Sequence, residues 1–137
     1  MKLSLLSSLA VVALCAVSPM FAHDADEFAA GHAEYLSACA ACHGENADGN
    51  GPIATMFKSP VPNLHGLSAA NDGVFPLLKV FQIIDGRSEV RGHRSPMPVF
   101  GNRYGKQAET TAGFYGAEPI VRARILELVY YLQSIQS

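Results

Sequence analysis

The sequence contains no tryptophan, only three cysteines and few charged side chains. Asp, Glu, Lys and Arg together make up 16% of the 137 residues, and the formal net charge is −2. The chain therefore lacks the basic excess that is typical of nucleic-acid-binding proteins, and we expect no nucleic-acid partner. It also lacks an internal repeat and a second closely spaced pair of cysteines, so a single Cys pair must account for the cysteine chemistry.

Only one long apolar run is present, and it lies at the N-terminus. Lys2 gives a positive start, residues 3–17 are mostly apolar, and Ala22 precedes a short charged stretch. This pattern is typical of a secretory signal peptide, so we expect residues 1–22 to be removed and residues 23–137 to act as a single periplasmic domain. An uncleaved N-terminal anchor is the alternative. After cleavage, we expect no membrane span in the remaining chain.

Basic residues are missing from the first part of the expected mature chain. Residues 23–56 carry six acidic side chains and no lysine or arginine, whereas residues 57–137 carry nine basic and six acidic side chains. This split suits a charge dipole that orients a transient partner, and it fits ordinary solvated faces equally well.

The one remaining Cys pair stands in an informative order. Cys39 and Cys42 are followed directly by His43, a spacing that is typical of covalent c-type haem attachment. Each thiol adds to one haem vinyl group, and the next side chain then points at the iron. We therefore predict one haem c bound through Cys39 and Cys42, with His43 as the proximal iron ligand.

Zinc binding, a redox pair and a disulfide are the three other interpretations of these cysteines. A structural zinc site needs two further Cys or His ligands at suitable spacing, and the sequence has no second pair. A thioredoxin-like redox pair normally accompanies a βαβ pattern, which is not visible here. A simple disulfide leaves the position of His43 unexplained.

Met97 is the predicted sixth ligand of the iron. It stands between Pro96 and Pro98, and prolines on both sides are incompatible with a place inside a regular helix. Such a rigid segment suits the presentation of a weak thioether ligand opposite His43, which raises the reduction potential. His93 as the ligand, an iron without a second protein ligand, and a loop methionine that covers an apolar gap are the alternatives.

Apolar residues at spacings of three and four predict three helices. The first runs from Asp24 to Ala38, the second is capped by Asn71-Asp72 and stops at Asp85-Gly86, and the last opens at Glu118-Pro119 and runs toward the C-terminus. The segments after Gly44 and between Gly101 and Gly116 are polar and rich in glycine, so we expect loops there. The second of these is long for a loop, which is typical of a functional or disordered segment.

With these motifs the chain resembles the class I c-type cytochromes, in particular the small bacterial exported ones with one haem. The likeness covers most of residues 25–135 and rests on the following segments: Gly31 and Tyr35, Cys39 to Gly44, Gly49-Asn50-Gly51-Pro52, Met97-Pro98, and Leu128 to Leu132. It implies an all-α cytochrome c-like fold with about three to five helices around one covalently bound haem. The first and last helices then cross near Gly31 and Tyr131.

The resemblance also implies roles for single residues. Pro52 is expected to offer the backbone carbonyl that holds the other ring nitrogen of His43. Phe100 stands where relatives often carry tryptophan, which accounts for the missing tryptophan as a change in packing.

The function implied is that of a one-electron carrier in an exported respiratory or oxidative pathway, not an enzyme, with redox proteins as donor and acceptor. A subunit of a dehydrogenase or oxidase complex is an alternative. An open sixth position would instead indicate a ligand-binding or peroxidatic haem protein. Four arginines flank the methionine segment and are expected to frame a docking face for an acidic partner. They are Arg87, Arg91, Arg94 and Arg103.

Overall fold

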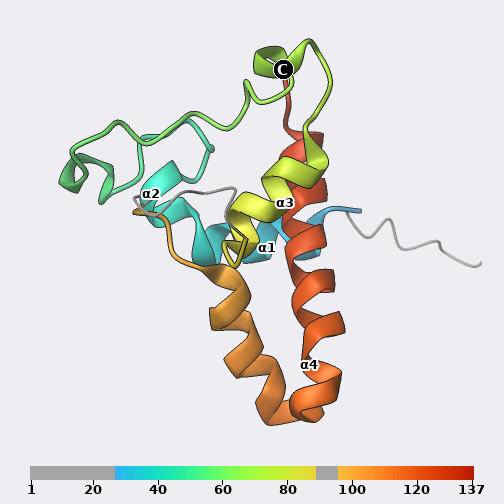
Figure 1. Ribbon diagram of the computed structural model, residues 1–137. Helices are drawn as coiled ribbons and strands as arrows, with labels where there is room; N and C mark the ends of the chain where they lie inside the picture. The colour runs from blue at the N-terminus through green and yellow to red at the C-terminus, as the bar shows by residue number, and fades with distance from the viewer. Residues whose placement is uncertain (1–26, 89–95) are drawn as a thin grey trace, which may run out of the picture.

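Helices joined by loops make up the part of the protein that the structure describes, which is residues 27–88 and 96–137 of a computed structural model (Figure 1). The elements are α1 (Ala29–Ala38), α2 (Ala40–His43), the 3₁₀ helices η1 (Ala54–Met56) and η2 (Ala69–Asn71), α3 (Leu77–Asp85), and α4 (Phe100–Ser134). No strand occurs among these residues, so the predicted all-α class is confirmed for them.

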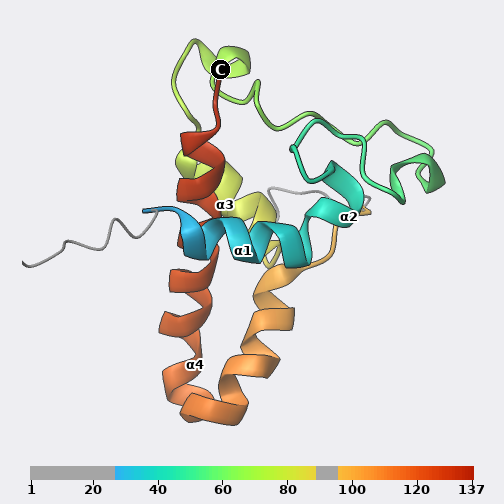
Figure 2. The ribbon, with the colours of Figure 1, turned by 180° about the vertical axis from the view of Figure 1, so that it is seen from behind.

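Helix α4 is a hairpin of two helical arms. Gly113 interrupts it with φ 68° and ψ 175°, a left-handed φ that glycine adopts at no steric cost. Figures 1 and 2 show the arms running antiparallel, with the end that carries the turn projecting away from the other helices. We call residues 100–112 the first arm, residues 114–134 the second arm, and residues 111–116 the tip.

The loop predicted between Gly101 and Gly116 is wrong, because this segment forms the first arm and the tip. Phe100, Tyr104 and Ala108 follow one another at a spacing of four and are all buried, which gives the arm an apolar face. Gly105 lies in the arm with open space around it. The second arm likewise begins before the predicted start, so that Pro119 lies inside the helix.

The second arm supplies the largest share of the buried core. Val121, Ile125, Leu128 and Val129 are fully buried, and each contributes roughly 1.5–3 kcal/mol by leaving water. Against them packs α3, whose buried side chains include Val80 and Ile84. The core therefore forms where α1 and α3 cover the upper half of the hairpin, as Figure 1 shows.

Helix α3 starts later than the sequence predicts. Asn71 and Asp72 do not cap it, because Asp72 is left-handed at φ 54° and the Asn71 amide donates to the carbonyl of Val74 at 2.8 Å. The helix begins at Leu77, directly after Pro76, and ends before Gly86 as expected. Side chains of Asn and Asp favour local turns for the same reason that they favour caps, so the sequence signal was ambiguous.

Helix α1 crosses the second arm at Gly31, as the resemblance implies. A Cβ at this position would meet the backbone carbonyl of Glu127 and would lie 2.8 Å from the Cβ of Tyr131. The ring of His32 stacks on that of Tyr131 with 4.9 Å between centroids. The described helix begins at Ala29, and Asp24, its predicted cap, lies outside the described residues.

Ion pairs join both arms of the hairpin to the body of the protein. Arg87, just after α3, donates two hydrogen bonds to Glu118 at 2.7 and 3.0 Å and one to the buried Asp85 at 2.8 Å. Glu34 of α1 accepts from Arg124 of the second arm at 2.7 Å and from the Tyr104 hydroxyl of the first arm at 2.7 Å. The bonds to Glu34 and Asp85 are charge-assisted and partly buried, and those to Glu118 are charge-assisted and exposed. Together they hold the arms in one orientation.

No helix among the described residues combines the length and apolar character needed to cross a lipid bilayer. The predicted signal peptide, residues 1–22, lies outside the described part of the chain.

Replacement of Gly31 by alanine tests the helix crossing. We expect Gly31→Ala to lower the free energy of unfolding by about 1–3 kcal/mol, because the added methyl group meets backbone atoms that cannot move aside. Gly105→Ala is the matched control: it has no atom within 4 Å of the new methyl group and should stabilise the helix by about 0.5–1 kcal/mol. Urea unfolding measures both, and equal effects of the two substitutions would contradict the crossing.

Candidate functional site

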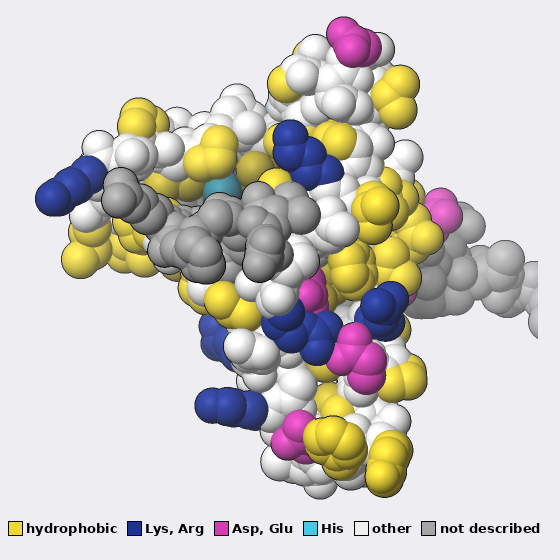
Figure 3. Space-filling model, in the orientation of Figure 1, with side chains coloured by type: hydrophobic (Ala, Val, Ile, Leu, Met, Phe, Trp, Pro, Cys, Tyr) yellow, Lys and Arg dark blue, Asp and Glu magenta, His cyan; other side chains and the backbone are white. Residues whose placement is uncertain are grey.

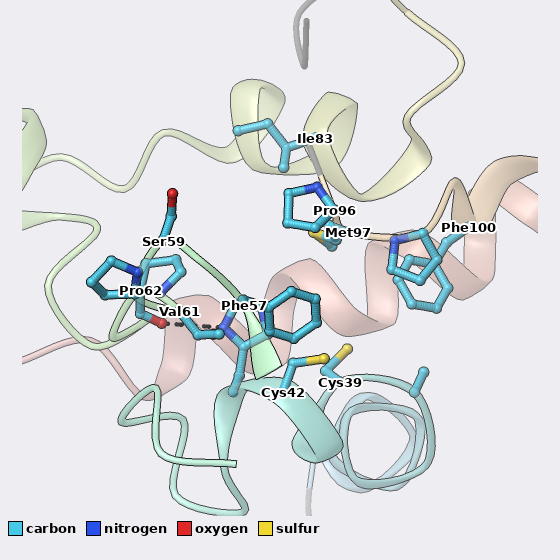
Figure 4. A pocket seen from close by; sticks show the side chains of 14 residues that line it. Cys39, Cys42, Phe57, Ser59, Val61, Pro62, Ile83, Pro96, Met97 and Phe100 are labelled. Carbon is cyan, nitrogen blue, oxygen red and sulfur yellow. Dashed lines mark hydrogen bonds between the residues drawn. The ribbon is translucent and has the colours of Figure 1, made fainter. Parts of the chain in front are cut away.

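A pocket of about 260 Å³ opens between α2, the 57–62 segment, α3 and the start of α4 (Figure 4). Its walls are mainly apolar, and none of the lining side chains is an Asp, Glu, Lys or Arg. The lining residues are Ala38, Cys39, Cys42, His43, Phe57, Ser59, Pro60, Val61, Pro62, Ile83, Pro96, Met97, Pro98 and Phe100. This set includes every Cys, His and Met for which the sequence predicts a role.

The cysteines lie at the junction of α1 and α2. The backbone turns there because Cys39 closes α1, with its N–H donating to the Tyr35 carbonyl at 2.8 Å, while its own carbonyl starts α2. Cys39 and Cys42 are free thiols. Figure 4 shows both sulfur atoms directed toward the side of the pocket on which Met97 lies.

The turn that carries the cysteines is held by Tyr35. Its side chain is fully buried, and its hydroxyl donates to the Gly44 carbonyl at 2.6 Å. Burial is the main reason that the pKa of Tyr35 is raised, so the hydroxyl stays a proton donor. Gly44 has φ 82°, which lets the chain leave α2 sharply behind His43.

The imidazole of His43 is oriented by a backbone carbonyl. Its Nδ1 lies 3.2 Å from the carbonyl oxygen of Pro62, and since a carbonyl only accepts, Nδ1 carries the proton. Nε2 is then left with the lone pair that binds a metal. Burial lowers the pKa of His43, although the Pro62 carbonyl opposes this, so the neutral, metal-binding form is favoured.

The prediction that the Pro52 carbonyl holds the ring of His43 is wrong. Pro52 is exposed, and the residues on either side of it pair with the carbonyls of the attachment segment: Gly51 N–H donates to Cys42, and Ile53 N–H donates to Ala41, both at 3.1 Å. The 51–53 segment is thus tied to the backbone of α2. Pro62 reaches the ring instead.

The 61–64 segment is brought to His43 by contacts with the loop that follows the motif. Leu64 N–H donates to the Ala47 carbonyl at 2.8 Å, and a Cβ at Gly49 would lie 2.5 Å from the Val61 carbonyl. Nothing in the sequence distinguished Pro62 from Pro52 as the partner of His43.

Met97 enters the pocket from a distant part of the chain, on the short segment that leads into α4. Pro96 and Pro98 line the pocket beside it, and Met97 packs against the buried core cluster. Its alternative, His93, lies outside the described residues, as do Arg91 and Arg94. Arg87, expected to face a partner, is engaged instead by Asp85 and Glu118.

The thiol of Cys39 is in an environment that disfavours ionisation. Burial, followed by the negative charge of Glu34, raises the pKa of Cys39 to about 12. A nucleophilic or redox-active cysteine needs the opposite shift, toward the thiolate. Among the described residues, no three His, Cys, Asp or Glu side chains are grouped so that they could hold a metal ion.

Three residues in and around the pocket were not predicted to have a role there. Phe57 and Ile83 form apolar walls of the pocket, which only the folded chain brings together. The third is His65, whose Nδ1 lies 2.7 Å from the Ile135 carbonyl and whose Nε2 lies 2.6 Å from the Asn46 carbonyl. It joins the loop after the attachment motif to the end of α4.

These residues suit a covalently bound haem. The two free thiols lie on one short turn, a neutral imidazole presents Nε2, and a thioether lies on another wall of an uncharged pocket. Each is a requirement of haem attachment and axial ligation.

No known protein family, curated protein or solved structure matches the chain.

The contacts of His65 predict a stability that depends on pH. Both ring nitrogens face carbonyl acceptors, so both bonds form only when the ring is protonated, and these bonds, with the nearby Asp48 charge, raise the pKa of His65. A raised pKa stabilises the fold fully below the unfolded value of 6.5, and this contribution is lost as pH rises through the folded value. We expect the free energy of unfolding to fall as the pH rises above 6.5.

Urea unfolding as a function of pH measures this change. His65→Gln should remove most of the fall, whereas His32→Gln, which removes the ring stacked on Tyr131, should leave it in place. A His65→Gln variant with the same pH profile as the unchanged chain would contradict the assignment.

Proposed function

We propose that the protein is a monohaem c-type cytochrome that transfers single electrons. The observation that carries the proposal is the meeting of Cys39, Cys42, His43 and Met97 around one uncharged pocket. Met97 lies more than fifty residues from the attachment motif in the sequence, so only folding brings the four together. The proposal rests on this site.

Each residue has a distinct role in the proposed site. Cys39 and Cys42 would hold the macrocycle through thioether bonds, and His43 and Met97 would bind the iron. When bound, the haem supplies the one-electron chemistry. The Pro62 carbonyl keeps His43 in the tautomer that ligates, and the apolar walls exclude water and so favour the lower charge of the reduced site.

Two protein ligands on the iron would distinguish an electron carrier from a catalyst. With both His43 and Met97 holding the iron, no ligand position would be left for oxygen or peroxide, so we expect electron transfer and no enzymatic activity. A subunit of a dehydrogenase or oxidase complex uses the same site, with other redox proteins as partners. An iron without Met97 would make it a ligand-binding or peroxidatic haem protein.

A thiol–disulfide enzyme is the candidate from another class. The raised pKa of Cys39 disfavours it, because a thiolate is the attacking species in disulfide exchange.

Export by the predicted signal peptide would place the protein in the periplasm, where it would meet c-type haem and its redox partners.

The absorption spectrum of the protein produced with covalent haem attachment tests the ligand set. We expect low-spin haem that stays on the chain under denaturing conditions, together with the far-red band of a methionine–iron bond in the ferric form. Met97→Ala should abolish this band and produce a high-spin ferric species that binds carbon monoxide when reduced.

Met56→Ala is the matched control. Met56 is the other methionine of the expected mature chain, is 79% exposed and does not line the pocket, so its loss should leave the spectrum unchanged. Chain without covalent haem would overturn the proposed function, and a far-red band that survives Met97→Ala would overturn the role of Met97.

A further inference from the structure

The tip of the α4 hairpin carries two exposed aromatic side chains. Phe114 is 77% and Tyr115 is 94% exposed, and the two rings form an edge-on pair with centroids 5.4 Å apart. Large aromatic side chains on a surface lose the free energy that burial would give them. Placing two of them together at the end of a projecting hairpin therefore points to a binding role.

The hairpin holds these rings in a fixed position. Its arms are bound to the body by Arg87 through Glu118, and by Glu34 through Arg124 and Tyr104. Between the arms, Gly113 makes the turn with its left-handed φ. A tip held in this way loses little conformational freedom when it binds.

The tip is uncharged. Residues 110–117 contain no Asp, Glu, Lys or Arg, and the nearest charged side chains along the chain are Glu109 and Glu118. Figure 3 shows hydrophobic side chains at the far end of the hairpin, with an acidic side chain directly beside them. Insertion of the 110–117 segment alone would desolvate no ionised group.

We propose that the tip inserts Phe114 and Tyr115 into the surface of a lipid bilayer. Aromatic rings, with tyrosine foremost, favour the region between lipid headgroups and acyl chains, because the ring leaves water while the hydroxyl keeps hydrogen-bond partners. The Tyr115 side chain is almost fully exposed and is therefore free to enter this region. The contact is shallow and reversible.

The shape of the molecule favours a lipid surface over a protein partner. A flat surface first touches a molecule at the parts that project from it. Figures 1 and 2 show from both sides that the tip is such a part. Two aromatic side chains offer roughly 300–500 Å². A stable protein interface, including a dimer of this chain, needs about 800 Å² from each partner, whereas a bilayer accepts a small apolar anchor.

Docking by the tip leaves the candidate haem site accessible. The pocket is lined by α2 and the segment before α4, and Figure 1 shows these at the opposite end of the first arm from the tip. A partner protein could thus reach the pocket while the tip contacts lipid. The proposal does not depend on the haem.

The absence of tryptophan gives a direct test. Tyr115→Trp makes a chain with a single tryptophan, and its fluorescence should shift to the blue when vesicles of phosphatidylcholine are added. Because insertion is apolar, the shift should persist at about 0.5 M salt, where electrostatic association is screened. Leu78→Trp, at a site on α3 that is 66% exposed, is the matched control and should show no shift.

A second variant measures the contribution of the neighbouring ring. Phe114→Ser, combined with Tyr115→Trp in the full chain, should weaken vesicle binding by at least about fivefold, since one aromatic side chain no longer leaves water. Equal shifts at positions 115 and 78, a shift that disappears at high salt, or the absence of any shift would each overturn the proposal. Self-association that requires Tyr115, without binding to vesicles, would assign the tip to a second copy and overturn it too.

Discussion

The close crossing of α1 and α4 at Gly31 is the constraint on which the rest of the structure depends. With no side chain at this position, the backbone of α1 approaches that of the second arm at Glu127. The approach buries Tyr35 one turn later, and its hydroxyl binds the Gly44 carbonyl. The segment between Tyr35 and Gly44 carries both cysteines. The helix–helix contact at Gly31, one turn before Tyr35, therefore sets the orientation of the attachment turn.

The candidate site is assembled by backbone hydrogen bonds and not by side-chain contacts alone. The loop after Gly44 folds back on α2 and then pairs with the 61–64 segment, which places the Pro62 carbonyl beside His43. His65 continues this segment and ties it to the end of α4. The chain thus closes a circuit from the attachment turn, through the segment that orients His43, to the helix that packs on α1.

The long hairpin has two separate tasks. Its upper half provides the buried residues that α1 and α3 cover, while its lower half projects beyond them and ends in exposed aromatic rings. Two groups of charge-assisted hydrogen bonds, centred on Glu34 and on Arg87, lie where the arms leave the core. They add to the burial of apolar side chains such as Phe100, Tyr104 and Val121, and together these contacts keep the projecting hairpin in a defined position.

The residues that meet at the candidate site could be chosen from the sequence because they stand in short, local patterns. The spacing of Cys39 and Cys42, the position of His43, and the prolines around Met97 are all readable without a fold. The periodicity of apolar residues likewise predicted three helices, whereas the all-α class and the crossing at Gly31 followed from the resemblance to the class I c-type cytochromes.

Only the tertiary structure decided the features that join segments far apart in the sequence. The choice of Pro62 over Pro52 depends on which backbone groups the folded loop has already paired, and the two ring contacts of His65 depend on where α4 ends. The 101–116 segment reads as a loop because its glycines lower helix propensity, yet burial of Phe100, Tyr104 and Ala108 against the second arm and α1 outweighs that cost. Local patterns determine which groups the chain offers, whereas packing determines which of them meet, because hydrogen bonding and burial depend on neighbours that the sequence does not place.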